Sequence, residues 1–186
     1  MSSVIPEDLR LSLVRRAGAL PGLGAYVFGA ATGMPYFRFL GLRSAAERAL
    51  WRGDLDEAEA HALELLRIAE RFQEDWHYGN AVHHGHSLLG RVALGRNNLT
   101  QAIEHLHESG KTPGSPQLKS FGPNMLLAKE LLELGEADAV LKYFDLCREF
   151  WRAGAWTAAT GRHPLDGWEE DVRADRTPEF GPNLVY

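Results

Sequence analysis

The stretch Leu89-Gly90-Arg91-Val92-Ala93-Leu94-Gly95-Arg96-Asn97-Asn98-Leu99-Thr100-Gln101-Ala102 decides the fold of this chain of 186 residues. Small residues fall on one face of a predicted helix that ends at Gly95, a tight polar turn follows, and a second helix begins at Leu99. The pattern predicts two antiparallel helices that cross closely, because small side chains let the backbones approach while larger apolar neighbours fill the flanks.

Comparable hairpins precede and follow this stretch. Apolar spacing predicts helix pairs over residues 44–52 and 55–72, over 80–94 and 99–108, and over 123–134 and 137–151. Ser44 with Glu47 three residues later matches a capping box at the start of the first helix, and Pro123 suits the first turn of the fifth. We therefore expect three helical hairpins.

The three hairpins align with one another, which indicates an internal repeat. The alignment points in the second helices are 44 and 38 residues apart. The aligned residues are Ala58, Ala102 and Val140, four residues later Ala62, Leu106 and Phe144, and in the first helices Ala46, Gly90 and Ala128, each preceded by Ala45, Leu89 or Leu127.

This pattern resembles the tetratricopeptide repeat, a helix-turn-helix unit of about 34 residues that stacks into a superhelix. The residues that carry the resemblance are Leu89-Gly90, Ala93, Ala102 and Leu106 in the middle hairpin, Ala46 and residues 53–58 in the first, and Leu127-Ala128, Gly135, Val140 and Phe144 in the third. The period here is longer, and the usual aromatic residues of the first helix are absent.

The resemblance implies an all-α fold, with three hairpins stacked as a short α-solenoid over residues 42–152. On the N-terminal side we expect a helix over residues 7–17 and an irregular apolar segment that continues to residue 41. On the C-terminal side, residues 153–186 are expected to form a cap helix, Pro164–Arg173, and a tail, because the ends of a solenoid need covering.

The resemblance also implies a binding face, because the first helices of such stacks line a concave surface that commonly binds a peptide. The residues that fall on this face by position are Arg43, Glu47, His84, Ser87, Arg91, Met125 and Lys129. Three cations and one acid favour an acidic peptide or a C-terminal carboxylate. We therefore expect a non-enzymatic protein–protein interaction module that needs no cofactor.

A cluster of histidines supports an alternative function, a metal- or small-molecule-binding helical protein. His77, His83, His84 and His86 lie within ten residues of one another. A metal site needs several such groups to converge with oriented partners, and neither an HExxH motif nor a carboxylate between Trp76 and Ile103 is present. The alternative interpretation is that these histidines form hydrogen bonds in hairpin packing.

The predicted loop before the third hairpin, GKTPGSPQLKSFG at residues 110–122, is a second candidate site. Lys111, Thr112, Ser115 and Lys119 offer charges and hydroxyls, and the glycines free backbone amides, so the loop could hold an anion or a peptide carboxylate. The other interpretation is a long linker, which the enlarged repeat period also predicts.

Composition excludes several classes of protein. The chain is 45% hydrophobic and 24% charged, which is typical of a folded domain, and its net charge of −5 gives no basic surface for nucleic acid. The one cysteine, Cys147, cannot form an internal disulfide and indicates a reducing, cytoplasmic location. The uncharged run 17–37 could be a membrane anchor or signal, but two prolines and five glycines interrupt it.

One tetrapeptide occurs twice near the C-terminus. Residues 121–124 and residues 180–183 both read Phe-Gly-Pro-Asn, and each copy is followed by two apolar residues. The second copy is either the start of a truncated fourth repeat or a tail that docks in an equivalent environment.

Overall fold

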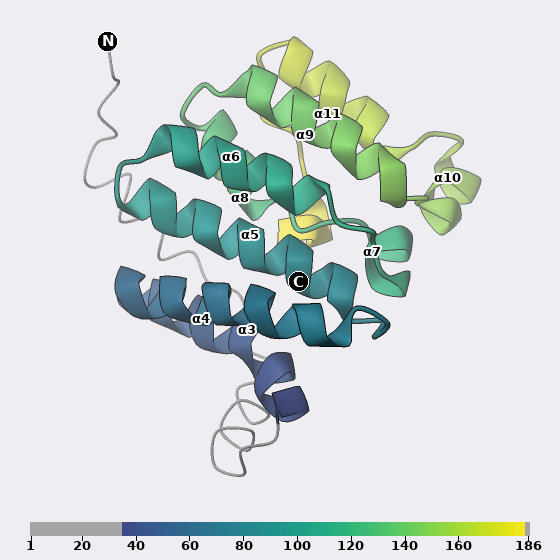
Figure 1. Ribbon diagram of the computed structural model, residues 1–186. Helices are drawn as coiled ribbons and strands as arrows, with labels where there is room; N and C mark the ends of the chain where they lie inside the picture. The colour runs from purple at the N-terminus through teal and green to yellow at the C-terminus, as the bar shows by residue number, and fades with distance from the viewer. Residues whose placement is uncertain (1–34, 185–186) are drawn as a thin grey trace.

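The computed structural model describes residues 35–184, and this part of the chain consists of helices, turns and loops without a strand (Figure 1). The prediction of an all-α fold is confirmed. The helices in chain order are α3 (Pro35–Arg52), α4 (Leu55–Ala69), η1 (Glu70–Phe72), α5 (Tyr78–Gly95), α6 (Leu99–Gly110), α7 (Pro116–Phe121), α8 (Leu126–Leu132), α9 (Ala137–Phe150), α10 (Gly154–Thr160), α11 (Pro164–Arg173) and η2 (Gly181–Leu184).

The longer helices form hairpins that follow one another through the molecule. Helix α3 pairs with α4, α5 with α6, and α8 with α9, while α4 packs on α5, α6 packs on α9, and α5 contacts both α3 and α8. Helix α11 lies against α9 at the end of this series (Figure 1). The superhelical arrangement of a solenoid stays a prediction.

The positions that align between the hairpins are buried at the helix crossings. Ala46, Ala58, Ala102, Ala128 and Val140 have no exposed surface. At Gly90 a Cβ atom would lie 2.4 Å from Cδ2 of Leu127 and 3.3 Å from the carbonyl oxygen of Ala102. Glycine avoids both contacts at the point where α5 approaches its hairpin partner α6 and helix α8 of the next hairpin.

Local polar chemistry starts two of the helices as expected, but not the first. The side chains of Asp54 and Asn98 accept hydrogen bonds from backbone amides at the starts of α4 and α6. The capping-box prediction at Ser44 is wrong, since α3 begins at Pro35 and Ser44 is buried within it. Helix α8 begins at Leu126, so Pro123 lies in the preceding linker rather than in the first turn.

The C-terminal third contains elements that the sequence pattern did not predict. The expected loop at residues 110–122 contains α7, and a short helix, α10, precedes α11. Helix α11 has its predicted bounds. None of the helices that the structure describes is long and apolar enough to cross a membrane, and the predicted helix over 7–17 and most of the run 17–37 lie outside the described residues.

Candidate functional site

The predicted binding face brings together Arg43, Glu47 and His84. The Arg43 guanidinium donates to a Glu47 carboxylate oxygen (2.8 Å) and to Nε2 of His84 (3.0 Å), which joins α3 to α5. Burial lowers the pKa of His84 well below its ordinary value, and the neighbouring Arg43 charge acts in the same direction. The three side chains therefore form a linked cluster with a neutral histidine.

The other members of this face lie mostly inside the molecule. Met125 is fully buried, Ser87 donates to the carbonyl oxygen of His83 (2.9 Å), and Arg91 forms an ion pair with buried Glu130 at 3.0 Å. Lys129 is half-buried. The prediction that Ser87, Arg91 and Met125 present their side chains to a partner is wrong, because packing between hairpins covers them.

The histidines of the predicted metal cluster point to different partners. His83 is fully buried, and its Nδ1 donates to the Ser109 carbonyl (3.2 Å) while its Nε2 accepts from the Asn124 amide (3.0 Å). His86 meets His105 at 3.2 Å, and His77 lies at the start of α5. Within residues 35–184 no three His, Cys, Asp or Glu side chains are placed to hold a metal ion.

The candidate loop residues mainly tie their segment to the start of α5. The Thr112 hydroxyl donates to the Gly79 carbonyl (2.7 Å), and the Ser115 hydroxyl donates to Asn80 (2.7 Å) and accepts from the Leu118 amide at the start of α7. Lys111 pairs with Glu108 at 2.5 Å. These contacts favour the linker interpretation for all of them except Lys119, whose side chain is exposed on α7.

The repeated Phe-Gly-Pro-Asn segments lie next to each other. The side-chain amide of Asn183 donates to the carbonyls of Phe121 (3.0 Å) and Pro123 (2.9 Å), and the Met125 amide donates to the Asn183 carbonyl (2.7 Å). Phe180 is buried against Trp168. The second copy is therefore a tail that docks on the body.

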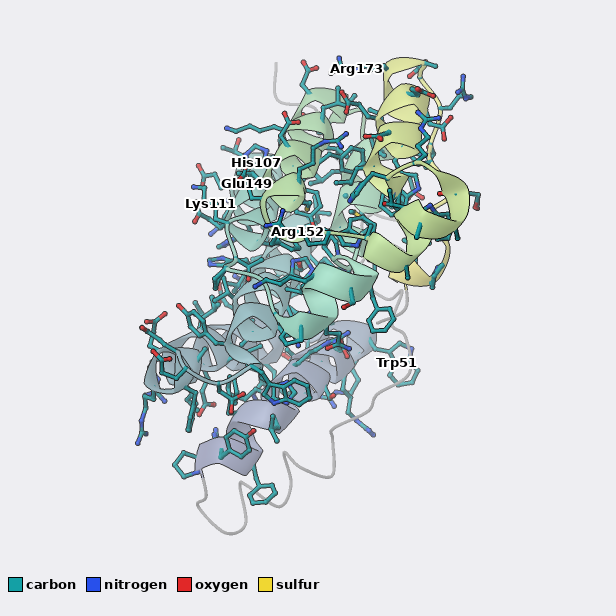
Figure 2. All side chains as sticks on the ribbon, turned by 90° about the vertical axis from the view of Figure 1, so that its right-hand side faces the viewer. Trp51, His107, Lys111, Glu149, Arg152 and Arg173 are labelled. Atoms are coloured by element: carbon teal, nitrogen blue, oxygen red, sulfur yellow. The ribbon has the colours of Figure 1, made fainter. Side chains whose placement is uncertain are left out.

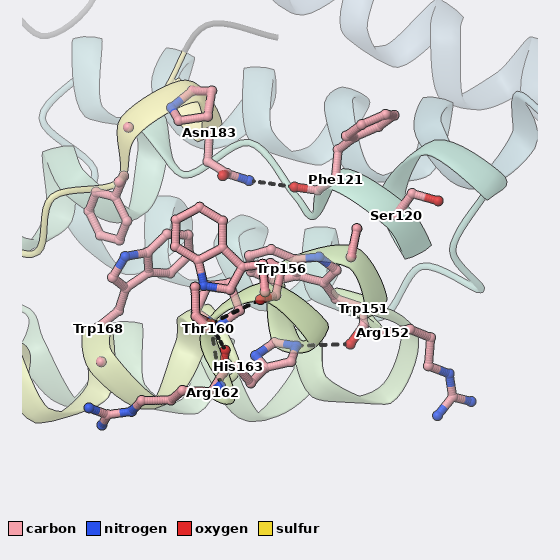
Figure 3. A pocket seen from close by; sticks show the side chains of 18 of the residues that line it. Ser120, Phe121, Trp151, Arg152, Trp156, Thr160, Arg162, His163, Trp168 and Asn183 are labelled. Carbon is pink, nitrogen blue, oxygen red and sulfur yellow. Dashed lines mark hydrogen bonds between the residues drawn. The ribbon is translucent and has the colours of Figure 1, made fainter.

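Docking of the tail creates a large pocket, about 1360 Å³ in volume, between α7, α10, α11 and the tail (Figure 3). Its lining is mostly apolar and includes the aromatic residues Phe121, Trp151, Trp156, Trp168 and Phe180. Helix α10 forms one wall and has no buried residue, so the pocket lies beneath a helix that contributes little to the core. No sequence motif pointed to this site.

Two of the aromatic residues are exposed, and the other three pack against one another. Trp156 and Phe121 expose 56% and 66% of their surface. The ring centroids of Trp151 and Trp168 are 5.5 Å apart, and those of Trp168 and Phe180 are 4.9 Å apart. The pocket thus combines a packed aromatic floor with apolar surface that is available for contact.

One polar group in the pocket wall has no hydrogen-bond partner within residues 35–184. Trp151 is 4% exposed and its indole Nε1 makes no hydrogen bond, whereas Nε1 of Trp168 donates to the Glu179 carbonyl (3.2 Å). Figure 3 shows the Trp151 indole turned toward the pocket. A buried N–H group without an acceptor costs about 1–3 kcal/mol. The indole nitrogen itself has essentially no accessible surface, so protein atoms enclose it.

The histidine of the pocket is neutral. His163 donates from Nε2 to the Trp151 carbonyl (3.2 Å), and its Nδ1 accepts from the Leu165 amide (3.2 Å). Burial lowers its pKa, and the nearby Arg148 charge acts in the same direction. This imidazole fixes the start of α11 and adds no charge to the pocket.

Charged residues lie around the rim. The Arg152 amide donates to the Lys119 carbonyl (3.1 Å), which places the backbones of these two exposed residues side by side. Neither side chain makes an ion pair within residues 35–184. Figure 2 shows Arg152 on the surface between α7 and α10. Among the other rim charges, Arg162 pairs with Glu170 and Asp171 with Arg176.

Comparison with known proteins identifies no relative of this chain. No protein-family profile matches the chain, and neither a curated protein nor a solved structure is significantly similar to it. One feature of the sequence could have drawn attention to the site: Trp151, Trp156 and Trp168, three of the five tryptophans, fall close together near the C-terminus.

Proposed function

We propose that this chain is a non-enzymatic, cytoplasmic protein–protein interaction module, and that it binds its partner in the pocket between α7, α10, α11 and the tail. The observation that carries the proposal is the exposed aromatic surface of Trp156 and Phe121 in a pocket that is also lined by the packed rings of Trp151, Trp168 and Phe180. Aromatic residues in a largely apolar pocket are the usual centre of binding energy at protein interfaces.

The proposed class of function, a protein–protein interaction module, is the one expected from the sequence. The proposed binding surface is the pocket instead of the face of the first helices. The face of the first helices offers mainly buried or paired side chains, such as Arg91 with Glu130 and Arg43 with Glu47. The pocket instead presents exposed aromatic surface, and the cations Lys119 and Arg152 on its rim make no ion pair within residues 35–184.

A non-enzymatic role is supported by the state of the strongest nucleophile. Cys147 is fully buried, and burial raises the pKa of its thiol far above the usual range, so it stays a thiol. The histidine nearest to the pocket, His163, has both ring nitrogens in hydrogen bonds.

Site-specific photocrosslinking tests the proposal. A benzophenone side chain replaces Trp156, or Trp51 as the matched control, because both tryptophans are 56% exposed and Trp51 lies on α3, away from the pocket (Figure 2). We expect position 156 to capture a protein that position 51 does not, and the purified partner should bind wild type but not Trp156→Ala. Equal capture at both positions, or binding that Trp156→Ala leaves unchanged, would reject the pocket as the binding site.

A further inference from the structure

Helix α10 lies on the hydrophobic core without contributing to it. None of its residues is buried, although several of them line the pocket. The core includes Ala153, directly before α10, and Leu165 in α11, but no residue of α10 itself. A segment with few buried apolar contacts opens at a lower free-energy cost than the helices of the core. Movement of α10 therefore leaves the rest of the fold intact.

Both ends of α10 have left-handed backbone conformations. Ala153 directly precedes the helix with φ 45° and ψ 34°, and Gly161 directly follows it with φ 72°. The left-handed region is unfavourable for alanine, and Ala153 is held there although it is only 1% exposed. Residues at the ends of an element that absorb changes of φ and ψ are the usual hinges of lids. Ala153 and Gly161 are placed to act as such hinges.

Unsatisfied polar groups gather at the same segment. Within residues 35–184, the enclosed side-chain polar atoms that lack a hydrogen-bond partner are Nε1 of Trp151, shortly before α10, and Oγ1 of Thr157, inside it. An enclosed polar group without a partner raises the free energy of the conformation that encloses it. When α10 moves away from the body, the Thr157 hydroxyl can form a hydrogen bond with water. The enclosed hydroxyl therefore favours a second, more open conformation.

Another threonine of α10 has the opposite role. The Thr160 hydroxyl lies within hydrogen-bond distance of the Trp156 carbonyl (2.9 Å) and the Arg162 carbonyl (3.0 Å), and it accepts from the Arg162 amide at 3.3 Å (Figure 3). These contacts join α10 to the segment beyond Gly161, so they hold the helix in its present position. Thr157 thus favours opening, and Thr160 opposes it.

We propose that α10 is a lid on the pocket, that it turns about Ala153 and Gly161, and that the partner enters when the lid opens. The inference rests on the proposed function and names how access to that site is controlled. It is carried by the lack of buried residues in α10, the left-handed residues at its two ends and the enclosed Thr157 hydroxyl.

Fluorine NMR of the full-length protein labelled with 5-fluorotryptophan tests the inference. Of the five tryptophans, Trp151, Trp156 and Trp168 line the pocket, whereas Trp51 and Trp76 do not. We expect relaxation dispersion on the microsecond to millisecond timescale at the three pocket residues, with one shared rate, because lids of this kind open on that timescale. Trp51 and Trp76 are the internal controls and should not share that rate.

Two matched variants within α10 sharpen the test. Thr157→Val keeps the shape of the side chain but removes the enclosed hydroxyl, so the population of the open state should fall about tenfold. Thr160→Val makes the same change but removes the contacts that hold the lid, so the open population should rise about threefold or more. The apparent Kd of the purified partner should rise for Thr157→Val by the factor by which the open population falls.

The outcomes separate the lid from the proposed function. Pocket tryptophans without exchange, or an open population that shifts in the same direction in both variants, would overturn the lid, and a partner captured at position 156 would still support the interaction module. A partner affinity that Thr157→Val leaves unchanged, despite a smaller open population, would overturn the control of access. If the exchange follows both variants but position 156 captures no specific partner, movement of α10 is supported, and the proposed function and partner entry are both rejected.

Discussion

Helix α5 of the middle hairpin and the C-terminal pocket differ in how their polar groups are satisfied. His83, Ser87 and Arg91 of α5 are buried and each has a hydrogen-bond partner. Those of His83 and Arg91 lie in neighbouring elements, and that of Ser87 is a carbonyl of α5 itself. In the pocket, the Trp151 indole nitrogen has no hydrogen-bond partner in the described part of the chain, and the side chain of Trp156 is exposed. Both regions contain several aromatic or ionisable side chains, but of the two only the pocket exposes a large aromatic side chain to a possible partner.

The difference teaches where to look for a binding site in a helical protein. Ionisable side chains such as His83 and Arg91 lie in the contacts between hairpins, where a buried polar group without a hydrogen-bond partner would destabilise the fold. The pocket lies where α10 contributes no buried residue and the tail returns to the body, so the packing there is incomplete. The following predictions test whether α5 is structural and the pocket is free to bind.

The largest effect is expected at the buried ion pair between α5 and α8. Glu130→Ala removes the carboxylate that lies 3.0 Å from the Arg91 guanidinium in the interior. Breaking one side of such a pair costs about 3–5 kcal/mol. The free energy of unfolding, measured in urea, should fall by that amount.

Two controls isolate the pair. Arg91→Met with Glu130→Leu should recover most of the loss, because an apolar pair avoids the uncompensated buried charge. Lys129→Ala, at the adjacent half-buried position, should change stability by less than about 0.5 kcal/mol. An equally small effect of Glu130→Ala would mean that Arg91 is available to a partner after all.

The second prediction concerns the pH dependence caused by His83. Burial lowers the pKa of His83 to about 4 in the folded protein, against 6.5 when exposed, so between these values the unfolded state binds the extra proton. The contribution of His83 to the free energy of unfolding is complete above pH 6.5. It is lost as the pH falls to 4, and the total loss is about 3 kcal/mol.

His83→Gln provides the comparison, since an amide can donate and accept but does not titrate in this range. We expect its urea stability to fall less steeply than that of wild type between pH 6.5 and 4, with parallel curves between pH 7 and 8. Other buried histidines titrate in both proteins, so the difference reports His83. Identical slopes would show that His83 is accessible to protons in the folded state.

A smaller effect is expected at the glycine that supports the pocket floor. Gly122 has φ 88° and ψ 177°, a region that is essentially restricted to glycine, and a Cβ atom there would lie 2.4 Å from the Trp151 ring. Gly122→Ala should destabilise the protein by about 2–3 kcal/mol and shift tryptophan fluorescence.

Gly135→Ala is the matched control, because Gly135 has φ 86° and open space around its Cβ position. It should cost about 1 kcal/mol from backbone strain alone and leave the fluorescence unchanged. Equal losses for the two variants would mean that Trp151 moves easily and that the pocket floor is not rigid.

The smallest effect on stability is expected at Trp156. Because its side chain is 56% exposed and α10 has no buried residue, Trp156→Ala should change the free energy of unfolding by less than about 0.5 kcal/mol. A loss of 2 kcal/mol or more, roughly that of a core truncation, would place Trp156 in the core and remove it from the surface that binds a partner.

Much of the fold could be predicted from the sequence because its signals are local. The turns before Leu55 and Leu99 and the buried small positions Ala58 and Ala102 were all readable from polar caps and apolar spacing. The start of α3 was missed because Gly41 reads as a breaker, yet it is buried inside the helix. Helix α10 was missed because an exposed helix has no apolar period.

The sequence by itself determined the helical hairpins, their turns and the residues that let the helices cross. Only the tertiary structure decided which side chains remain available. It buried Arg91 against Glu130, placed His83 between Ser109 and Asn124, and returned the tail to Phe121 to complete the pocket. Whether a polar group is satisfied depends on partners that lie far away in the chain, and no local pattern encodes that pairing.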